Sequence, residues 1–261
     1  MRITVFLWIA ALLVSLSACS RERADSGSKQ QDAQSLPKIA VDAATAAGIS
    51  GTVHFSGTPQ KPRGIDMTQD PSCKGENEAE SLRVQDGRLA NVYVYVEDGL
   101  QAGQYEGPRT NEVVVDQKGC RYVPHVIAVT TGQPVRILNS DDTTHNVHPM
   151  PQNNREWNQS QTPGAEPVVK RFSNPETMIP VKCNNHPWMS MFVNVASHPF
   201  FAVTGTDGKF RIAGLPPGTY TLAAVHEKLG ERTLTLTLGP KENKQADFTF
   251  DTHVSAASTV K

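Results

Sequence analysis

The stretch Met178-Ile-Pro-Val-Lys-Cys183, followed after a loop by Met191-Phe-Val-Asn-Val195, decides the fold class. In the first half, apolar residues recur at every second position, which is the period of a β-strand. This alternation places Ile179, Val181 and Cys183 on one face. We therefore predict two short strands joined by the residues 184–190.

The same pattern continues outward along the chain. Tyr122-Val-Pro-His-Val-Ile-Ala-Val129 and Gly132-Gln-Pro-Val-Arg-Ile-Leu-Asn139 are predicted strands separated by a glycine turn, and a polar loop, Asp141-Asp-Thr-Thr-His-Asn-Val-His148, comes after them. Across the chain, 19 Gly and 18 Pro interrupt short runs of β-forming residues, and amphipathic helical windows are scarce. The composition predicts an all-β protein.

Length and charge limit the function classes. The chain has 261 residues, 38% of them hydrophobic and 20% charged, which fits one large or two small globular domains and excludes a collagenous, coiled-coil or wholly disordered chain. The formal net charge is −1. Because there is no basic field to attract a polyanion, we expect no nucleic acid among the partners.

The N-terminus predicts export. Arg2 is followed by an apolar run that ends in small residues, so residues 1–18 are predicted to be a signal peptide. Leu16-Ser17-Ala18-Cys19 resembles a bacterial lipobox. The resemblance implies lipidation of Cys19 and a lipid-anchored protein in the periplasm, at the outer membrane because Ser20 follows rather than Asp. Residues 19–47 contain few large apolar groups and are predicted to be a flexible tether after the lipidated cysteine.

Three cysteines remain in an oxidising compartment once Cys19 is assigned to lipid. Cys183 lies in Cys183-Asn-Asn-His-Pro-Trp-Met189, a cluster of soft and borderline metal ligands, and we assign it to a metal. Cys73 and Cys120 are then predicted to pair by elimination. Spacing alone leaves open a disulfide of Cys73 or Cys120 with Cys183.

The donor types indicate copper. A thiolate and two imidazoles with a weak thioether suit both oxidation states of copper, whereas hard cations prefer oxygen donors. Across residues 113–195, the predicted strands, the spacing of His145 and Asn146 after Asn139, and the order Cys183, His186, Met resemble the cupredoxins, the blue-copper β-sandwich proteins. The resemblance implies a Greek-key cupredoxin domain over residues 109–197, with one copper ion held by His145, Cys183 and His186.

Spacing leaves two methionines as candidates for the axial ligand. Plastocyanin-like loops would select Met191, but matching the strand end after the loop favours Met189 and a loop two residues shorter. The shorter loop leaves His148 near the metal, as a residue expected to contact a ligand rather than to bind the ion itself. A zinc site built on Cys183, His145 and His186 is the alternative to copper.

A second β pattern flanks this domain. Residues 200–250 contain the hairpin signal Asp207-Gly208 and alternate with period two from Thr233 to Leu238. With residues 48–98 they resemble the carboxypeptidase regulatory-like module, a small transthyretin-like β-sandwich. We predict that residues 48–98 and 200–250 fold together with the cupredoxin-like domain inserted between them. Two domains in simple series are the alternative, and residues 251–261 are a predicted disordered tail.

The function implied by the resemblance is electron transport. Pro187 and Trp188 would form an apolar rim where redox partner proteins dock transiently. We expect no enzyme, because the sequence has neither the His-x-His pairs of multicopper oxidases nor a Cys-x-x-Cys-His haem motif. The alternatives are a copper-binding or delivery protein, and a surface interaction module with a structural metal.

Overall fold

The computed structural model describes residues 37–105 and 111–252, and all of them belong to one compact unit of the chain. These residues form strands, turns and loops without any helix, so the all-β prediction is confirmed. Within the same ranges, accordingly, no helix is long and apolar enough to cross a membrane. The predicted signal peptide, Cys19, most of the tether and most of the tail lie outside the described residues.

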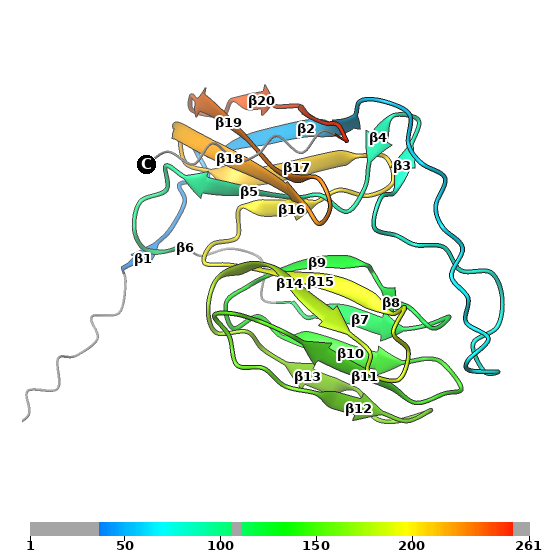
Figure 1. Cartoon of the computed structure of the whole chain (residues 1–261). Helices are drawn as coiled ribbons and strands as arrows, with labels where there is room; N and C mark the ends of the chain where they lie inside the picture. Colours follow the sequence, from blue (N-terminus) through cyan, green and yellow to red (C-terminus); the bar gives the residue numbers. More distant parts are fainter. Residues whose placement is uncertain (1–36, 106–110, 253–261) are drawn as a thin grey trace, which may run out of the picture. The chain divides into compact units, whose positions relative to one another are not determined.

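Residues 113–196 form two sheets, which we call the central sandwich (green to yellow in Figure 1). One sheet has four strands in the order β13 (Val168–Lys170), β10 (Val135–Asn139), β7 (Val113–Gln117), β8 (Tyr122–Val123). The other has five strands in the order β12 (Gln159–Gln161), β11 (His145–Pro149), β14 (Glu176–Lys182), β15 (Ser190–Ala196), β9 (Val126–Thr130).

Alternating apolar residues explain why these strands pack face to face. In β10, Val135 and Ile137 are buried while Arg136 between them is not, and β14 buries Ile179 and Val181 in the same way. Side chains from both sheets share one hydrophobic cluster. The predicted strands 122–129, 132–139 and 178–183 therefore coincide with observed ones within a few residues, apart from a break that divides the first into β8 and β9.

The flanking sandwich is built from residues 47–98 and 201–250. Its first sheet runs β16 (Phe201–Val203), β5 (Tyr93–Asp98), β18 (Gly218–His226), β19 (Gly230–Leu238). Its second sheet runs β17 (Lys209–Leu215), β2 (Ala47–Phe55), β4 (Arg88–Leu89), β3 (Val84–Gln85), and both β20 (Asn243–Gln245) and β21 (Phe248–Phe250) pair with β2. Segments before and after the central sandwich in sequence thus share both of these sheets.

The end of the predicted tether is structured. β1 (Lys38–Ile39) pairs in parallel with β6 (Gln104–Tyr105), and the Ala44 amide donates to the Asp42 carboxylate at 2.8 Å in the turn that precedes β2. Ile39 lies against Gly103, where a Cβ would meet its side chain at 2.4 Å. Residues 37–47 thus differ from the predicted flexible tether, because they make a strand pair, a carboxylate-capped turn and contacts of Val41 with the core of the flanking sandwich.

A long connection between β2 and β3, residues 56–83, links the flanking sandwich to the central one. It contains an isolated bridge between Gly64 and Glu78 and no named strand. Met67 and Cys73 of this connection are buried in the hydrophobic cluster of the central sandwich. In Figure 1 it is the long cyan segment, and we call it the β2–β3 connection.

Candidate metal centre

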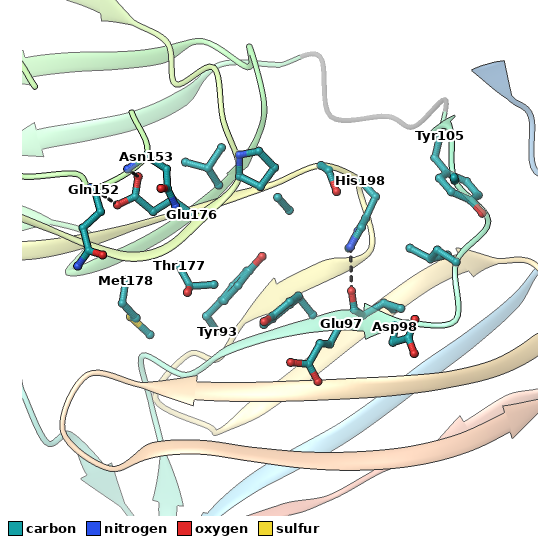
Figure 2. A pocket seen from close by; sticks show the side chains of 18 of the residues that line it. Tyr93, Glu97, Asp98, Tyr105, Gln152, Asn153, Glu176, Thr177, Met178 and His198 are labelled. Carbon is teal, nitrogen blue, oxygen red and sulfur yellow. Dashed lines mark hydrogen bonds between the residues drawn. The ribbon is translucent and has the colours of Figure 1, made fainter. Parts of the chain in front are cut away.

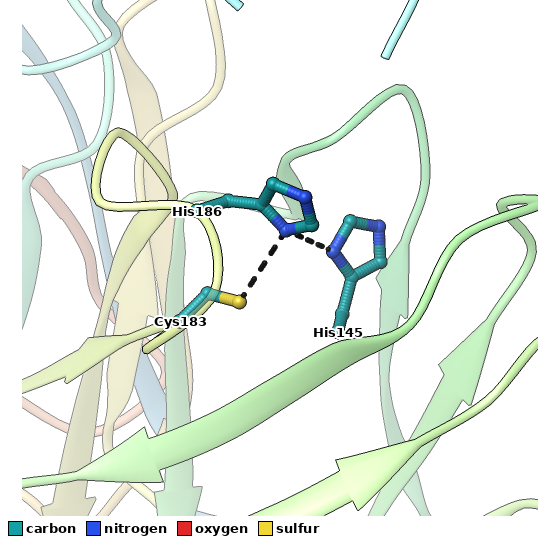
Figure 3. Close-up of side chains that lie close together, drawn as sticks. All are labelled: His145, Cys183 and His186. Carbon is teal, nitrogen blue, oxygen red and sulfur yellow. Dashed lines mark hydrogen bonds between the residues drawn. The ribbon is translucent and has the colours of Figure 1, made fainter. Parts of the chain in front are cut away.

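Three buried donors converge at one end of the central sandwich (Figure 3). The His145 and His186 Nδ1 atoms are 2.8 Å apart, and the Cys183 Sγ is 3.6 Å from the His186 Nδ1. All three ligand atoms lie within 4.8 Å of one another. The exposed fractions are 0% for His145, 2% for Cys183 and 3% for His186. The sequence-predicted trio is therefore brought together in a buried site.

Strand pairing explains this convergence. His145 is the first residue of β11, and Cys183 directly follows the last residue of β14. These two strands are antiparallel neighbours, with His148 opposite Lys182. The loop between β14 and β15 is closed by the Met189 amide, which donates to the His186 carbonyl at 2.9 Å. The donors are thus held by strand ends and one tight loop.

A carboxylate lies against the outer nitrogen of each imidazole. The His145 Nε2 is 2.9 Å from Asp141 Oδ2, and the His186 Nε2 is 2.8 Å from Asp70 Oδ2. Hydrogen bonds from the Ser72 amide, His186 and Thr143 hold the pKa of Asp70 well below its usual range, so this carboxylate is ionised at neutral pH. Each Nε2 therefore carries the hydrogen that it donates, which leaves the Nδ1 lone pair available.

The inner face of the site fits a cation. Burial lowers the pKa of His145, which favours its neutral form. With each Nε2 against a carboxylate, the two Nδ1 atoms lie 2.8 Å apart, and the sulfur lies 3.6 Å from the Nδ1 of His186. An ion placed between these atoms would have two nitrogens and one sulfur as donors. Sulfur together with imidazole nitrogen is a soft donor set that suits copper or zinc rather than calcium or magnesium.

Asn146 organises the sulfur donor. Its backbone amide lies 3.4 Å from the Cys183 Sγ, and its side-chain oxygen lies 3.3 Å from the same sulfur. The same oxygen accepts a hydrogen bond from the Asn184 amide at 2.8 Å. The Tyr122 hydroxyl donates to the Asn146 carbonyl, and burial, followed by the nearby Cys183, raises the pKa of this phenol. The sulfur thus lies among groups that fix its position.

The other sequence-predicted residues lie around this centre. Met189 and Met191 are both 1% exposed, and Met191 lines an apolar space inside the sandwich with Val115 and Ile137. The structure does not bring His148 to the centre, because its ring nitrogens lie 3.1 Å from Asn184 Oδ1 and 2.6 Å from Glu156 Oε1.

The two residues of the predicted apolar rim lie next to His186 in sequence and differ in exposure. Pro187 is exposed and Trp188 is half-buried. The Trp188 ring centroid is 5.1 Å from that of His186, and its indole N–H donates to the Cys120 carbonyl at 3.2 Å. Trp188 therefore bridges a metal-donor ring and the segment that carries Cys120.

Cys73 and Cys120 form a disulfide across 47 residues of chain, as predicted, and Cys183 is the free cysteine among the described residues. The Asp141 side chain binds this region as well, because its two oxygens accept hydrogen bonds from the Gly119 and Cys120 amides at 2.7 and 2.8 Å. The alternative disulfides to Cys183 do not occur. The disulfide therefore lies beside the carboxylates that bind the two imidazoles.

Sequence reasoning missed Asp70, Asp141 and the role of Asn146. Asp141 precedes His145 by four residues in a loop already singled out, so its proximity could have been suspected. Asp70 is 116 residues from His186 in sequence, and no local pattern marks it. The predicted Cys73–Cys120 pairing was the one available signal, since it brings the neighbourhood of Asp70 to the central sandwich.

The structure also has a separate cavity of about 840 Å³. Figure 2 shows side chains that line it. Its wall includes Tyr93, Glu97, Glu176 and His198, and none of the metal donors lines it. The His198 Nε2 donates to the Val96 carbonyl at 2.8 Å, and Glu176 accepts hydrogen bonds from the Gln152 and Asn153 amides. His198 and Glu176 therefore already have partners inside the protein, and the hydrogen bonds of these two residues do not define a ligand for the cavity.

Several solved structures resemble part of the chain. It is similar to the copper-containing nitrite reductase (NirK) from Thermus scotoductus SA-01, with 21% identity over 39% of this chain and 25% of that one, at a TM-score of 0.30. It is similar to a purple cupredoxin from Nitrosopumilus maritimus, with 19% identity over 32% of this chain and 99% of that one, at a TM-score of 0.28. A mutant of amicyanin in the oxidised state gives 19% identity over 39% of this chain and 97% of that one, at a TM-score of 0.30.

The chain therefore spans about a quarter of the nitrite reductase and almost all of the other two proteins. No protein-family model matches the chain, and no curated protein sequence matches it. The TM-scores are low, so the donor geometry alone supports a function for the site.

Proposed function

We propose that the protein is an electron carrier that holds one copper ion between His145, Cys183 and His186. The observation that supports this most is the convergence of two Nδ1 atoms and one sulfur within 4.8 Å in a buried site. Met189 is the proposed axial ligand, because it ends the loop that carries His186 while Met191 packs in the apolar interior.

Copper bound to a thiolate and imidazoles supplies a one-electron couple between Cu(I) and Cu(II). The protein itself contributes by fixing the positions of the three donor side chains. Cys183 binds as a thiolate, and the Asn146 amide then donates to its sulfur. The two carboxylates orient the imidazoles through their outer nitrogens. Since two strand ends and one tight hydrogen-bonded loop hold the three donors, we expect little rearrangement to accompany a change of charge.

Burial of the donors favours electron transfer over catalysis on a bound substrate. With at most 3% of each donor residue exposed, water and small molecules have little access to the metal. We propose on this basis that the protein is not an enzyme. A copper-delivery role would require the site to open before the metal could leave, and the closed site is less suited to it.

Electrons would leave through Trp188 and Pro187. The indole ring is 5.1 Å from the His186 ring and half-buried, and the neighbouring Pro187 is exposed. The short ring-to-ring distance and the exposure of Pro187 support the proposal that a redox partner protein docks transiently at these two residues.

We also propose that the protein is exported and anchored through a lipid on Cys19, at the periplasmic side of the outer membrane. The Cys73–Cys120 disulfide supports an oxidising compartment. Incorporation of a labelled fatty acid should be lost in Cys19→Ser and retained in the wild type. Labelling that persists in the variant would contradict lipidation at Cys19.

Copper titration of the metal-free protein tests the central proposal. The wild type should bind one equivalent of Cu(II) and develop an intense visible thiolate-to-copper absorption band. Cys183→Ser should abolish the band, whereas the control His148→Gln should keep it, because His148 lies outside the donor group. A colourless wild-type complex, or a band that survives in Cys183→Ser, would contradict a copper–thiolate site.

A further inference from the structure

The carboxylate on the outer nitrogen of His186 comes from outside the central sandwich. Asp70 belongs to the β2–β3 connection, which joins two strands of the flanking sandwich, and it reaches His186 across 116 residues of sequence. The carboxylate on His145 has a different origin, since Asp141 precedes β11 within the central sandwich itself. The two imidazoles thus contact carboxylates from two parts of the chain that are far apart in sequence.

The position of Asp70 is fixed by several contacts. Its Oδ1 accepts a hydrogen bond from the Ser72 amide at 2.8 Å, and its Oδ2 accepts one from the Thr143 hydroxyl at 2.7 Å in addition to His186. Its amide donates to the Met67 carbonyl at 3.1 Å, and its own carbonyl accepts from the Cys73 amide at 3.0 Å. These contacts hold the Asp70 carboxylate at His186 without any contribution from a bound metal.

Two anchors hold this part of the connection on the central sandwich. Cys73, three residues after Asp70, is bonded to Cys120, and Met67, three residues before it, is buried in the central hydrophobic cluster. The Asn77 side-chain amide lies 3.4 Å from the Met67 sulfur. Asp70 therefore lies between two residues that attach the connection to the central sandwich, Cys73 through its disulfide and Met67 through its burial.

We infer that Asp70 is a positioning residue that orients His186 for copper and stabilises Cu(II) relative to Cu(I). This inference rests on the proposed copper site. As an acceptor at Nε2, Asp70 fixes the tautomer in which Nδ1 binds the metal. Its negative charge, added to those of Asp141 and the Cys183 thiolate, interacts more favourably with the doubly charged ion than with the singly charged one.

The affinities of Asp70→Asn for the two oxidation states test the inference. Asparagine keeps the size of the side chain and removes its charge. We expect Cu(II) affinity to fall about 10- to 100-fold, and Cu(I) affinity to fall less. The ratio of Cu(II) affinity to Cu(I) affinity therefore drops. This drop is measured as a higher reduction potential of the bound copper. The matched control is Asp142→Asn, which removes the same charge from an exposed position in the loop before His145 and should leave the ratio unchanged.

A purely structural role for Asp70 would weaken both oxidation states equally and leave the potential unmoved, and that result would overturn the inference. If the wild type fails to bind copper, the proposed function fails, and this inference fails with it. If the wild type binds copper and Asp70→Asn changes neither ratio nor affinity, the inference alone fails.

Nitrogen NMR of the wild type loaded with Cu(I) gives a second test that does not depend on folding of a variant. The His186 Nε2 should carry a hydrogen and its Nδ1 should not. A His186 ring with the hydrogen on Nδ1, or with none on Nε2, would overturn the assignment of Asp70 as its acceptor.

Discussion

Asn146 joins the sulfur donor to the strand that carries His145. Its side-chain oxygen accepts from the Asn184 amide and lies beside the Cys183 sulfur, and its side-chain amide donates to Asn158 Oδ1 at 2.7 Å. One buried asparagine thus holds two segments of the site in register. Removal of its side chain leaves several polar groups without a protein partner.

We therefore expect Asn146→Ala to lower the free energy of unfolding of the metal-free protein by about 1–3 kcal/mol. Urea denaturation measures the change. Asn111→Ala, at an exposed position, is the control and should have little effect on the unfolding midpoint. Equal stability of the Asn146→Ala variant and the wild type would show that the Asn146 hydrogen bonds do not support the fold.

At the scale of elements, β14 supports the metal centre through its buried face. Ile179 is 0% exposed and Val181 is 2% exposed, and the strand leads directly to Cys183. Ile179→Ala should cost about 2–5 kcal/mol of stability, because it leaves a cavity in the shared core. Thr177→Ala, at an exposed position on the same strand, is the matched control. An equal shift of the unfolding temperature in both variants would contradict the assignment of Ile179 to the buried face and Thr177 to the exposed face of β14.

The disulfide connects two elements that are distant in sequence. In the chain-entropy model, a crosslink over 47 residues is worth about 4 kcal/mol. The double variant Cys73→Ser, Cys120→Ser should lose stability of this order in chemical denaturation under non-reducing conditions. A dithiol should destabilise the wild type and leave the variant unaffected. A wild type whose unfolding midpoint does not respond to complete reduction would contradict a stabilising crosslink.

The strands were largely predictable because their evidence is local. Alternation at Ile179, Val181 and Cys183 marks a half-buried strand in any sequence, and the glycine at 132 marks a turn. Two of the donors were predictable for a related reason, since Cys183 directly follows β14 and His186 lies in the loop after it. His145 was expected in a polar loop and is instead the first residue of β11. Cysteine and histidine are also among the few residue types that bind soft metal ions, which limited the number of candidate donors.

The long-range contacts were not predictable from local pattern. Asp70 looks like any acidic residue in a polar stretch, and its role depends on a fold that carries the β2–β3 connection to His186. The ordering of residues 37–47 depends likewise on contacts with residues 103–105. Such contacts leave no periodic pattern of apolar residues in the sequence. They form between residues far apart in the chain and do not require the neighbouring residues to alternate between apolar and polar.

At the scale of the whole molecule, a buried histidine makes stability depend on pH. His226, at the end of β18, is 1% exposed, and its Nε2 has no hydrogen-bond partner among the described residues. Burial lowers its pKa from 6.5 to about 4. Between these two values the unfolded chain binds a proton that the folded chain does not, so the free energy of unfolding falls as the pH falls from about 6.5 to about 4.

The full effect of this one group is about 3 kcal/mol. Burial also lowers the pKa of His198, which acts in the same direction. His226→Phe should flatten the slope of stability against pH in this window, while His54→Gln, at an exposed position, should not. Denaturation midpoints measured between pH 4 and 7 give the slope of stability against pH for each of the two variants. An unchanged slope in His226→Phe would contradict a buried neutral His226.

The proposed function of the molecule depends on one ion shared by three side chains. Anomalous diffraction at the copper absorption edge, from crystals of the copper-loaded protein, tests this most directly. We predict one strong anomalous peak per chain, within bonding distance of the Nδ1 atoms of His145 and His186 and the sulfur of Cys183. A peak bound elsewhere, or no peak in fully loaded crystals, would contradict it.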